Sequence, residues 1–194
     1  MKAPIRLLAL YSILSTPSLF ADIEIYKIDP VHSSITFKIQ HFFSHVSGSF
    51  TSFSGTLHYD PSNPSNNYAE GTIDARSINT HNTKRDDHLN KDDFLHTEKY
   101  PSITFQTTHW KPNGENRFEV TGNLKIQETT LPVKLDTTFL GSGDGPNNTY
   151  LSGWSATTEL SRSAFGIPYG KPTIGDIVSV EISIEAQRIE KGND

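Results

Sequence analysis

Apolar and polar residues alternate along most of the chain between residues 23 and 188. Every second residue is apolar in the segments 35–40, 118–126 and 131–139. The cleanest example is 178–186, where valine, isoleucine and alanine alternate with serine and glutamate. A period of two places all apolar side chains on one face of an extended strand. Strands with one dry and one wet face are typical of antiparallel sheets.

Clusters of turn-forming residues at 60–64, 112–114 and 141–148 punctuate this pattern. They separate nine extended runs, which we place at residues 23–28, 33–41, 45–59, 68–76, 102–109, 117–126, 130–140, 150–160 and 176–188. The runs predict an all-β protein of about eight strands, with one run at an edge. In the run 45–59 the apolar phase changes between Phe50 and Phe53, and a bulge at Thr51 and Ser52 would restore the facing and bend the strand around a closing barrel.

The segment from Thr83 to Tyr100 breaks the alternation. It is polar and rich in charge, with Leu89, Phe94 and Leu95 as its apolar residues, and Pro101 follows it. Such a pattern predicts a short helical insertion near 83–99 that ends before the proline. We expect it to cover an end of the barrel or to form a packed connection.

The N-terminus has the order of a secretory signal peptide. Lys2 and Arg6 supply positive charge, 7–14 is an apolar run too short to span a bilayer, and 15–21 is small and polar. We predict a signal peptide at 1–21, cut after Ala21, although Leu19 is larger than the residue usual at that position. The alternative is an uncleaved amphipathic helix, but no charged face is present. Export to the periplasm is the expected localisation.

Composition narrows the function classes. The segment 22–194 has the length of one domain with its own core. Without 1–21 it carries 15 basic and 22 acidic residues, a formal net charge of −7, which argues against a nucleic-acid partner. The chain has no cysteine, so a disulfide framework and a cysteine nucleophile are excluded, and the Gly-x-Ser-x-Gly motif of α/β-hydrolases is absent.

Histidines and aspartates gather in the segment 81–96, which raises the question of a metal site. The residues are His81, Asp86, Asp87, His88, Asp92 and Asp93. No two of them have a recognised ligand spacing, so we predict no metal. A metal-dependent stress-response enzyme that uses this segment is kept as a less favoured functional hypothesis.

Six motifs occur in order along the chain. They are Asp29-Pro30-Val31-His32-Ser33, Gly48-x-Phe50-x-x-Phe53-x-Gly55, Arg85-Asp86-x-His88-Leu89, Phe94, Tyr100-Pro101-x-Ile103-x-Phe105 and Ser161-Arg162-x-x-Phe165-Gly166. Together they resemble the YceI family of polyisoprenoid-binding proteins over about 25–188. One departure is 127–130, which reads Gln-Glu-Thr-Thr where members often have a turn glycine, so this hairpin is expected to be longer or differently shaped.

The resemblance implies a lipocalin-like barrel, usually periplasmic, that holds the tail of an isoprenoid quinone or polyprenyl phosphate in an apolar tunnel. It implies no catalytic residues and no required cofactor, with the bound lipid as ligand. The alternative is a general amphiphile binder for fatty acids or fatty amides. Transient contact with inner-membrane redox proteins and a homodimer are further partner hypotheses.

Aromatic residues at period two are ordinary core, so without the resemblance a filled barrel is favoured over a pocket. With it, the expected tunnel residues are Phe37, Ile39, Phe42, Phe50, Phe53, Phe94, Phe105, Phe118, Leu135, Phe139, Trp154 and Phe165. Arg85, His88 and Arg162 are candidate head-group contacts, since arginine presents a rigid fork of donors. The alternatives are structural: a helix cap at Asp86 or His88, and ion pairs for the two arginines.

Overall fold

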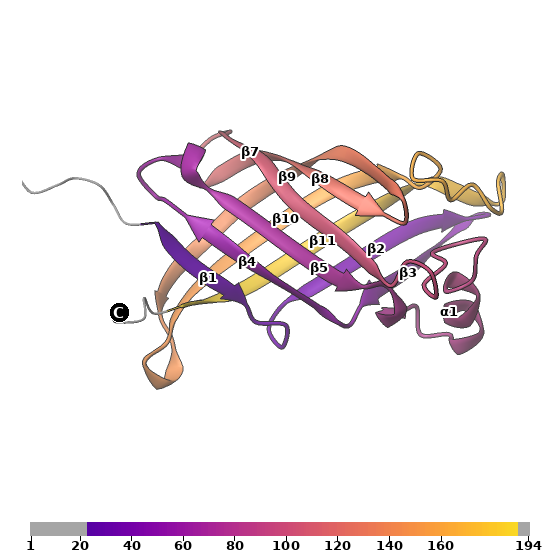
Figure 1. Ribbon diagram of the computed structural model, residues 1–194, viewed down its shortest axis with the longest axis horizontal. Helices are drawn as coiled ribbons and strands as arrows, with labels where there is room; N and C mark the ends of the chain where they lie inside the picture. The colour runs from indigo at the N-terminus through magenta and orange to yellow at the C-terminus, as the bar shows by residue number, and fades with distance from the viewer. Residues whose placement is uncertain (1–22, 190–194) are drawn as a thin grey trace, which may run out of the picture.

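Residues 23–189 are described by a computed structural model, and they form a closed antiparallel β-barrel (Figure 1). The strands are β1 (Glu24–Ile28), β2 (Ser34–His41), β3 (Ser44–Phe50), β4 (Phe53–Tyr59), β5 (Tyr68–Asp74), β6 (Ile78–Asn79), β7 (Ser102–Pro112), β8 (Arg117–Ile126), β9 (Thr129–Asp144), β10 (Tyr150–Ser161) and β11 (Ile174–Arg188). Eight of them close a ring in the order β1–β4–β5–β7–β8–β9–β10–β11, and β11 pairs back to β1. The predicted barrel of about eight strands with a short helix is confirmed.

The remaining strands continue the wall at one end. β11 pairs with β1 at Ile28 and with β2 from Ser34 onward, so β1 and β2 act as one bent strand of the wall. Two runs of the sequence therefore count as one strand. The predicted edge lies at β3 and β6. Among residues 23–189, β6 pairs with β3 alone, and β3 pairs with β6 only at Ser49 and Phe50.

The run 45–59 is not one bulged strand, as the alternation predicted, but two strands. β3 pairs with β2 and β6, whereas β4 pairs with β1 and β5. At the break, the backbone N–H groups of Thr51 and Ser52 donate to the backbone oxygen and the hydroxyl of Ser77, at the end of the 3₁₀ turn η2 (Ala75–Ser77). A turn in the neighbouring segment thus replaces the strand ladder where the wall bends.

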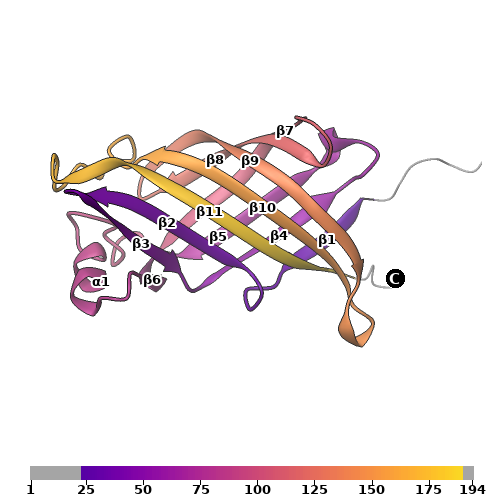
Figure 2. The same cartoon turned by 180° about the vertical axis from the view of Figure 1, so that it is seen from behind.

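The two ends of the barrel differ. At one end, here the cap end, lie α1 (Thr83–Leu89), the β2–β3 and β8–β9 hairpins and the β10–β11 loop (Figures 1 and 2). The opposite end, here the far end, carries the β7–β8 hairpin, the 3₁₀ turns η1 (Pro64–Asn66) and η3 (Pro146–Asn148), and both ends of the described chain. Within residues 23–189, no helix has the length and apolarity needed to cross a bilayer.

The helical insertion is shorter than the expected 83–99. The Asn82 side chain caps the start of α1 by accepting from the Arg85 N–H at 3.0 Å, and the helix ends at Leu89. The Asn90 side chain then donates to the Asp86 carbonyl at 2.8 Å and accepts from the Thr97 hydroxyl at 2.8 Å. These bonds fold the chain into turns, because asparagine competes for the carbonyls that a longer helix would use.

The β8–β9 hairpin is tight, not long. Ile126 pairs with Thr129, so Gln127 and Glu128 form a two-residue turn, with Gln127 at a φ of 55°. The Glu128 carboxylate accepts hydrogen bonds from Lys99 and from the Tyr100 hydroxyl. The turn thereby holds the segment that follows α1, which explains how it forms without glycine.

Candidate functional site

A cavity of about 550 Å³ runs inside the barrel from the cap end toward the far end. Its volume lies within the range of small-molecule sites in proteins. Its wall is mainly aliphatic: β11 contributes Val178, Val180, Ile182 and Ile184, which alternate with outward residues along the strand. The alternation of this segment thus produces one continuous apolar side of the cavity.

Two phenylalanine rings of the wall lie against glycines on neighbouring strands. Phe37 pairs with Gly48, and a β-carbon on Gly48 would come within 2.5 Å of the Phe37 ring. Phe105 lies against Gly122 in the same way. Because the glycines leave room for the rings beside the wall, these large side chains do not fill the cavity.

Aromatic rings close the cavity toward the far end. Trp154 contacts Tyr59, Trp110 and Phe139 with ring centroids 5.1, 5.8 and 4.7 Å apart, and Trp110 contacts Phe118 at 5.6 Å. We call these five residues the aromatic plug. Trp110 and Trp154 also line the cavity and form its floor.

Strand irregularities aim the plug inward. The β7–β8 register shifts between Thr107 and His109, and the β9–β10 register shifts at Trp154. Before its shift β7 places Phe105 and Thr107 inside, and after it Trp110. Uninterrupted alternation from Phe105 and Thr107 would place Trp110 on the outer face of β7. The bulge adds one residue and so turns Trp110 inward.

The floor also contains polar atoms. Among the described residues, the indole N–H of Trp110 and the hydroxyl of Thr137 are buried without a protein partner, and both residues line the cavity. The floor therefore offers a donor and a hydroxyl to a polar atom inside the cavity.

The cap end is covered by two segments that meet at an aromatic contact. His88 of α1 lies 5.0 Å from the Phe94 ring and 5.4 Å from the Tyr169 ring, which belongs to the β10–β11 loop. His88 also bonds Asp93 at 2.7 Å, and Phe165 of the loop is buried. Apolar and aromatic contacts thus join the two covering segments.

Arg85 is a half-buried cation at this end of the cavity. Its Nε donates to the Thr80 hydroxyl at 2.7 Å, and its Nη2 donates to the Thr80 carbonyl at 2.8 Å. Thr80 in turn donates to Asp86. Within residues 23–189 the guanidinium forms no ion pair, so N–H groups remain for an anionic or carbonyl group of a ligand.

Arg162 is bonded quite differently. It is only 7% exposed, and it donates to the backbone oxygens of Ile167, Tyr169, Ile174 and Gly175. Four of its five N–H groups thus hold the β10–β11 loop and the start of β11. Burial lowers the pKa of Arg162, while nearby Asp176 opposes this change. Arg162 borders the cavity, and these bonds favour the structural alternative over a head-group contact.

Nine of the twelve expected tunnel residues line the cavity: Phe37, Ile39, Phe50, Phe53, Phe94, Phe105, Leu135, Trp154 and Phe165. The other three lie elsewhere. Phe118 and Phe139 belong to the plug beneath the floor, and Phe42 is 55% exposed in the β2–β3 turn. Phe42 leaves the barrel because the turn begins at this residue, which ends the alternation.

The expected set missed most of the aliphatic wall. Val46, Val133, Val178 and Val180 line the cavity, whereas the expected set is mainly aromatic. The period of two in 131–139 and 178–186 was the signal that identifies these side chains as inward. Aliphatic side chains make up most of the lining of the cavity.

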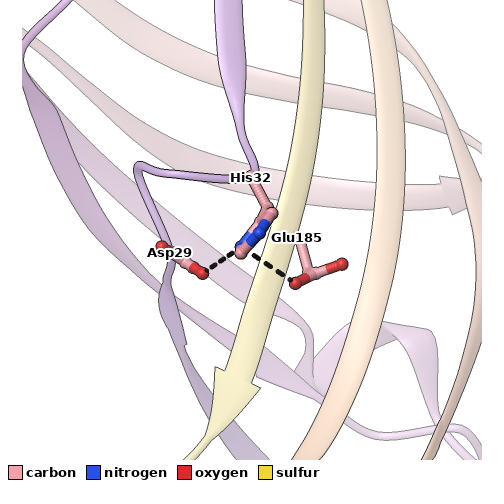
Figure 3. Close-up of side chains that lie close together, drawn as sticks. All are labelled: Asp29, His32 and Glu185. Carbon is pink, nitrogen blue, oxygen red and sulfur yellow. Dashed lines mark hydrogen bonds and ion pairs between the residues drawn. The ribbon is translucent and has the colours of Figure 1, made fainter. Parts of the chain in front are cut away.

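A polar cluster outside the cavity joins Asp29, His32 and Glu185 (Figure 3). His32 Nδ1 bonds Asp29 Oδ2 at 2.7 Å and lies 3.6 Å from Glu185 Oε1. The hydrogen bond raises the pKa of His32 and lowers the pKa of Asp29. Ser33 exchanges hydrogen bonds with the Glu185 backbone at 3.1 and 3.0 Å, so this motif holds the bend between β1 and β2 against β11.

The histidines and aspartates of 81–96 do not form such a group. In the described part of the chain, the only cluster of three or more metal-ligand residues is the one at Asp29. In the other segment, Asp86 accepts from Thr80, and His88 bonds Asp93. These side chains are used to fold the insertion itself.

Known proteins match this chain over most of its length. The family described as "YceI-like domain" matches residues 26–186. A UPF0312 protein of Pseudomonas aeruginosa is 35% identical over 193 residues, covering 97% of this chain and 99% of its own, and one of Pectobacterium atrosepticum is 36% identical over 166 residues, covering 84% and 86%.

Solved structures show the same barrel. A Campylobacter jejuni YceI protein is 26% identical, with a TM-score of 0.71 over 94% of this chain and 100% of its own. BcnA of Burkholderia cenocepacia has a TM-score of 0.75 at 23% identity, covering 81% and 98%. A domain from Saccharophagus degradans, described as polyisoprenoid-binding, has a TM-score of 0.64 at 16% identity, covering 84% and 98%.

Proposed function

Since the chain belongs to the YceI-like family, we propose that it is a lipid-binding protein that holds the tail of an isoprenoid lipid inside the barrel. The observation that carries this proposal is the cavity itself, with an aliphatic wall, an aromatic floor and a cap of two segments. The description of the Saccharophagus domain supports an isoprenoid as the cargo class. We further propose that the protein acts in the periplasm, after removal of 1–21.

The physical basis is burial of hydrocarbon. Each buried CH₂ gains about 0.8 kcal/mol, so a tail of several isoprene units has ample driving force even after association and ordering costs. The aliphatic side chains of β9 and β11 supply this surface without needing directional contacts. Affinity then depends on tail length more than on head-group identity.

Arg85 is the proposed head-group contact. Its free N–H groups lie where a tail anchored on the aromatic floor would bring a phosphate or a carbonyl to the cap end. A charge-assisted hydrogen bond is roughly twice as strong as a neutral one. A polyprenyl phosphate should therefore bind more tightly than the corresponding alcohol.

The test combines lipid identification with titration. Protein exported by its native host and purified without detergent is examined by native mass spectrometry, and we expect a co-purifying prenyl lipid. Delipidated protein is then titrated with a polyprenyl phosphate and with a fatty amide of similar length. Tighter binding of the amide would favour the general amphiphile binder, and no binding of either would overturn the proposal.

Arg85→Gln sharpens this test. Loss of the charge should weaken binding of the polyprenyl phosphate by on the order of tenfold and leave the alcohol unchanged. Lys84→Gln, an adjacent and exposed position, is the matched control. An equal loss for phosphate and alcohol would indicate damage to the cap rather than a head-group contact.

A further inference from the structure

The turn of the β2–β3 hairpin presents two phenylalanines at the cap end. Phe43 is fully exposed, and Phe42 is 55% exposed. His41 pairs with Ser44, so the two phenylalanines are the turn residues themselves. Phe42 has a φ of 49°, a region where glycine and asparagine are favoured and where a bulky side chain is strained. The fold would be served better by other residues, which suggests a different role for the rings.

Hydrogen bonds hold the hairpin tip beside the cavity. The Phe42 N–H donates to the Thr173 carbonyl of the β10–β11 loop at 2.8 Å, and the Gln40 side chain donates to the Phe42 carbonyl at 3.1 Å. His41 lines the cavity and contacts the Phe42 ring, with centroids 4.9 Å apart. Side chains therefore lead without interruption from the cavity wall to the exposed tip.

Further apolar surface lies along the same side of the cap end. Tyr169 lines the cavity and is also exposed, and Ile177 is exposed where the β2–β11 register is interrupted next to His41. Both views show the hairpin tip and the β10–β11 loop together, with α1 set to one side of them (Figures 1 and 2). The element α1, which carries Asp86 and Asp87, is thus set to one side of the tip.

Charge distinguishes this part of the chain from the rest. The protein has 22 acidic residues, yet none occurs from Val31 to Tyr59, the stretch that contains the whole hairpin. Lys38, His41 and His45 are present there. Across the β10–β11 loop, the carboxylate of Asp176 is neutralised by Lys171 at 2.9 Å. The hairpin can therefore approach an anionic surface without repulsion from its own carboxylates.

We propose that Phe42 and Phe43 insert into the surface of an anionic lipid bilayer and so place the cap end of the cavity against the membrane. The inference rests on the proposed lipid-binding function, because a membrane is the phase from which an insoluble lipid would enter. Two protruding rings suit a fluid apolar phase, whereas a stable protein interface needs about 800 Å² on each partner. Aromatic side chains favour the membrane interface.

The test measures partitioning onto vesicles of phosphatidylcholine containing phosphatidylglycerol, by flotation. We expect the protein to bind these vesicles, Phe43→Ser to weaken binding about tenfold, and Phe42→Asn with Phe43→Ser to weaken it further. Phe43→Trp should retain binding. Leu140→Ser is the matched control, because Leu140 is 62% exposed on the far half of β9 and should have no effect.

Several results would overturn the docking. They are the absence of vesicle binding by the unmodified protein, equal binding by the double variant, an equal loss in Leu140→Ser, or a dimer in sedimentation that only the double variant abolishes. Geranylgeraniol binding measured without vesicles separates the two proposals. If the unmodified protein does not bind geranylgeraniol, the lipid-binding function is refuted. The membrane docking is judged by vesicle partitioning alone.

Discussion

The two halves of the barrel are built from the same alternating strands but differ in what they enclose. Toward the far end, the interior is packed by the aromatic plug of Tyr59, Trp110, Phe118, Phe139 and Trp154. Toward the cap end, the interior is a cavity walled mainly by valine and isoleucine. Alternation only determines that a side chain points inward. Side-chain volume, the glycines opposite it and the bulges decide whether the space is filled.

Stability should therefore depend more on the plug than on the cavity wall. Phe118→Ala removes a buried ring with neighbours on all sides, and we expect a loss of about 3–5 kcal/mol in the free energy of unfolding. Phe105→Ala removes a ring that faces an existing cavity, so a loss of roughly 1.5 kcal/mol is expected. Urea unfolding with an unchanged m-value measures both, and equal losses would contradict the division of the barrel.

The two arginines at the cap end offer the next contrast. Arg162→Met should cost about 3 kcal/mol, because it leaves two backbone carbonyls of the β10–β11 loop and two at the start of β11 without their buried donor. Arg85→Met should cost about 1 kcal/mol, because it removes two hydrogen bonds from the half-buried Arg85 to Thr80, whose hydroxyl keeps its bond to Asp86. Thermal unfolding compares them. A larger loss of stability in Arg85→Met would contradict this assignment, in which Arg162 is structural and Arg85 contacts the ligand.

A substitution at Gly122, which lies behind the lining residue Phe105, should narrow the cavity. Gly122→Ala places a methyl group against the Phe105 ring and the Gln106 backbone, so the ring must move into the lumen. We expect a loss of about 1–3 kcal/mol in stability and on the order of tenfold in affinity for a prenyl lipid. Combining it with Phe105→Leu should restore most of the affinity, as isothermal titration would show. No rescue would mean that the backbone contact, and not the ring, causes the effect.

The smallest effect is expected outside the barrel, at the bend held by Asp29 and His32. The pKa of His32 is raised in the folded protein. Its contribution to folding stability is therefore fully present below the ordinary histidine pKa of 6.5, and it is lost as the pH rises through the pKa of the folded state. The pKa of Asp29 is lowered in the folded protein. Its contribution to folding stability is therefore present above the ordinary aspartate pKa of 3.8, and it is lost as the pH falls through the pKa of the folded state. The pair is thus most favourable between about pH 4 and 6.5.

His32→Gln tests this window. The difference in melting temperature from the unmodified protein should be largest between about pH 4 and 6.5, and it should shrink at higher pH as His32 loses its charge. Both side chains are solvent-accessible, so the difference should also diminish in high salt. His45→Gln, an exposed histidine for which no ion pair is found in residues 23–189, serves as the control. A difference that is constant with pH would mean that packing, not charge, holds the bend.

Alternation along the chain predicts the class of fold and identifies many inward positions, although the expected tunnel set left out most of the aliphatic wall. The inward residues of 178–186 follow directly from alternation, because successive side chains of a strand point to opposite faces. The motif of Asp29, His32 and Ser33 and the polar insertion can also be identified from the sequence, but their contacts cannot.

The part of the barrel that is filled, and the arginine that keeps free N–H groups, depend on contacts between distant segments of the chain. Trp110 faces inward because a bulge after Thr107 reverses the phase of β7, and the sequence contains no local mark of that shift. Arg85 and Arg162 occupy similar polar motifs, yet one keeps free N–H groups and the other is consumed by carbonyls up to 13 residues away along the chain. Register and long-range hydrogen bonds depend on how distant strands meet, and alternation along one strand carries no information about that meeting.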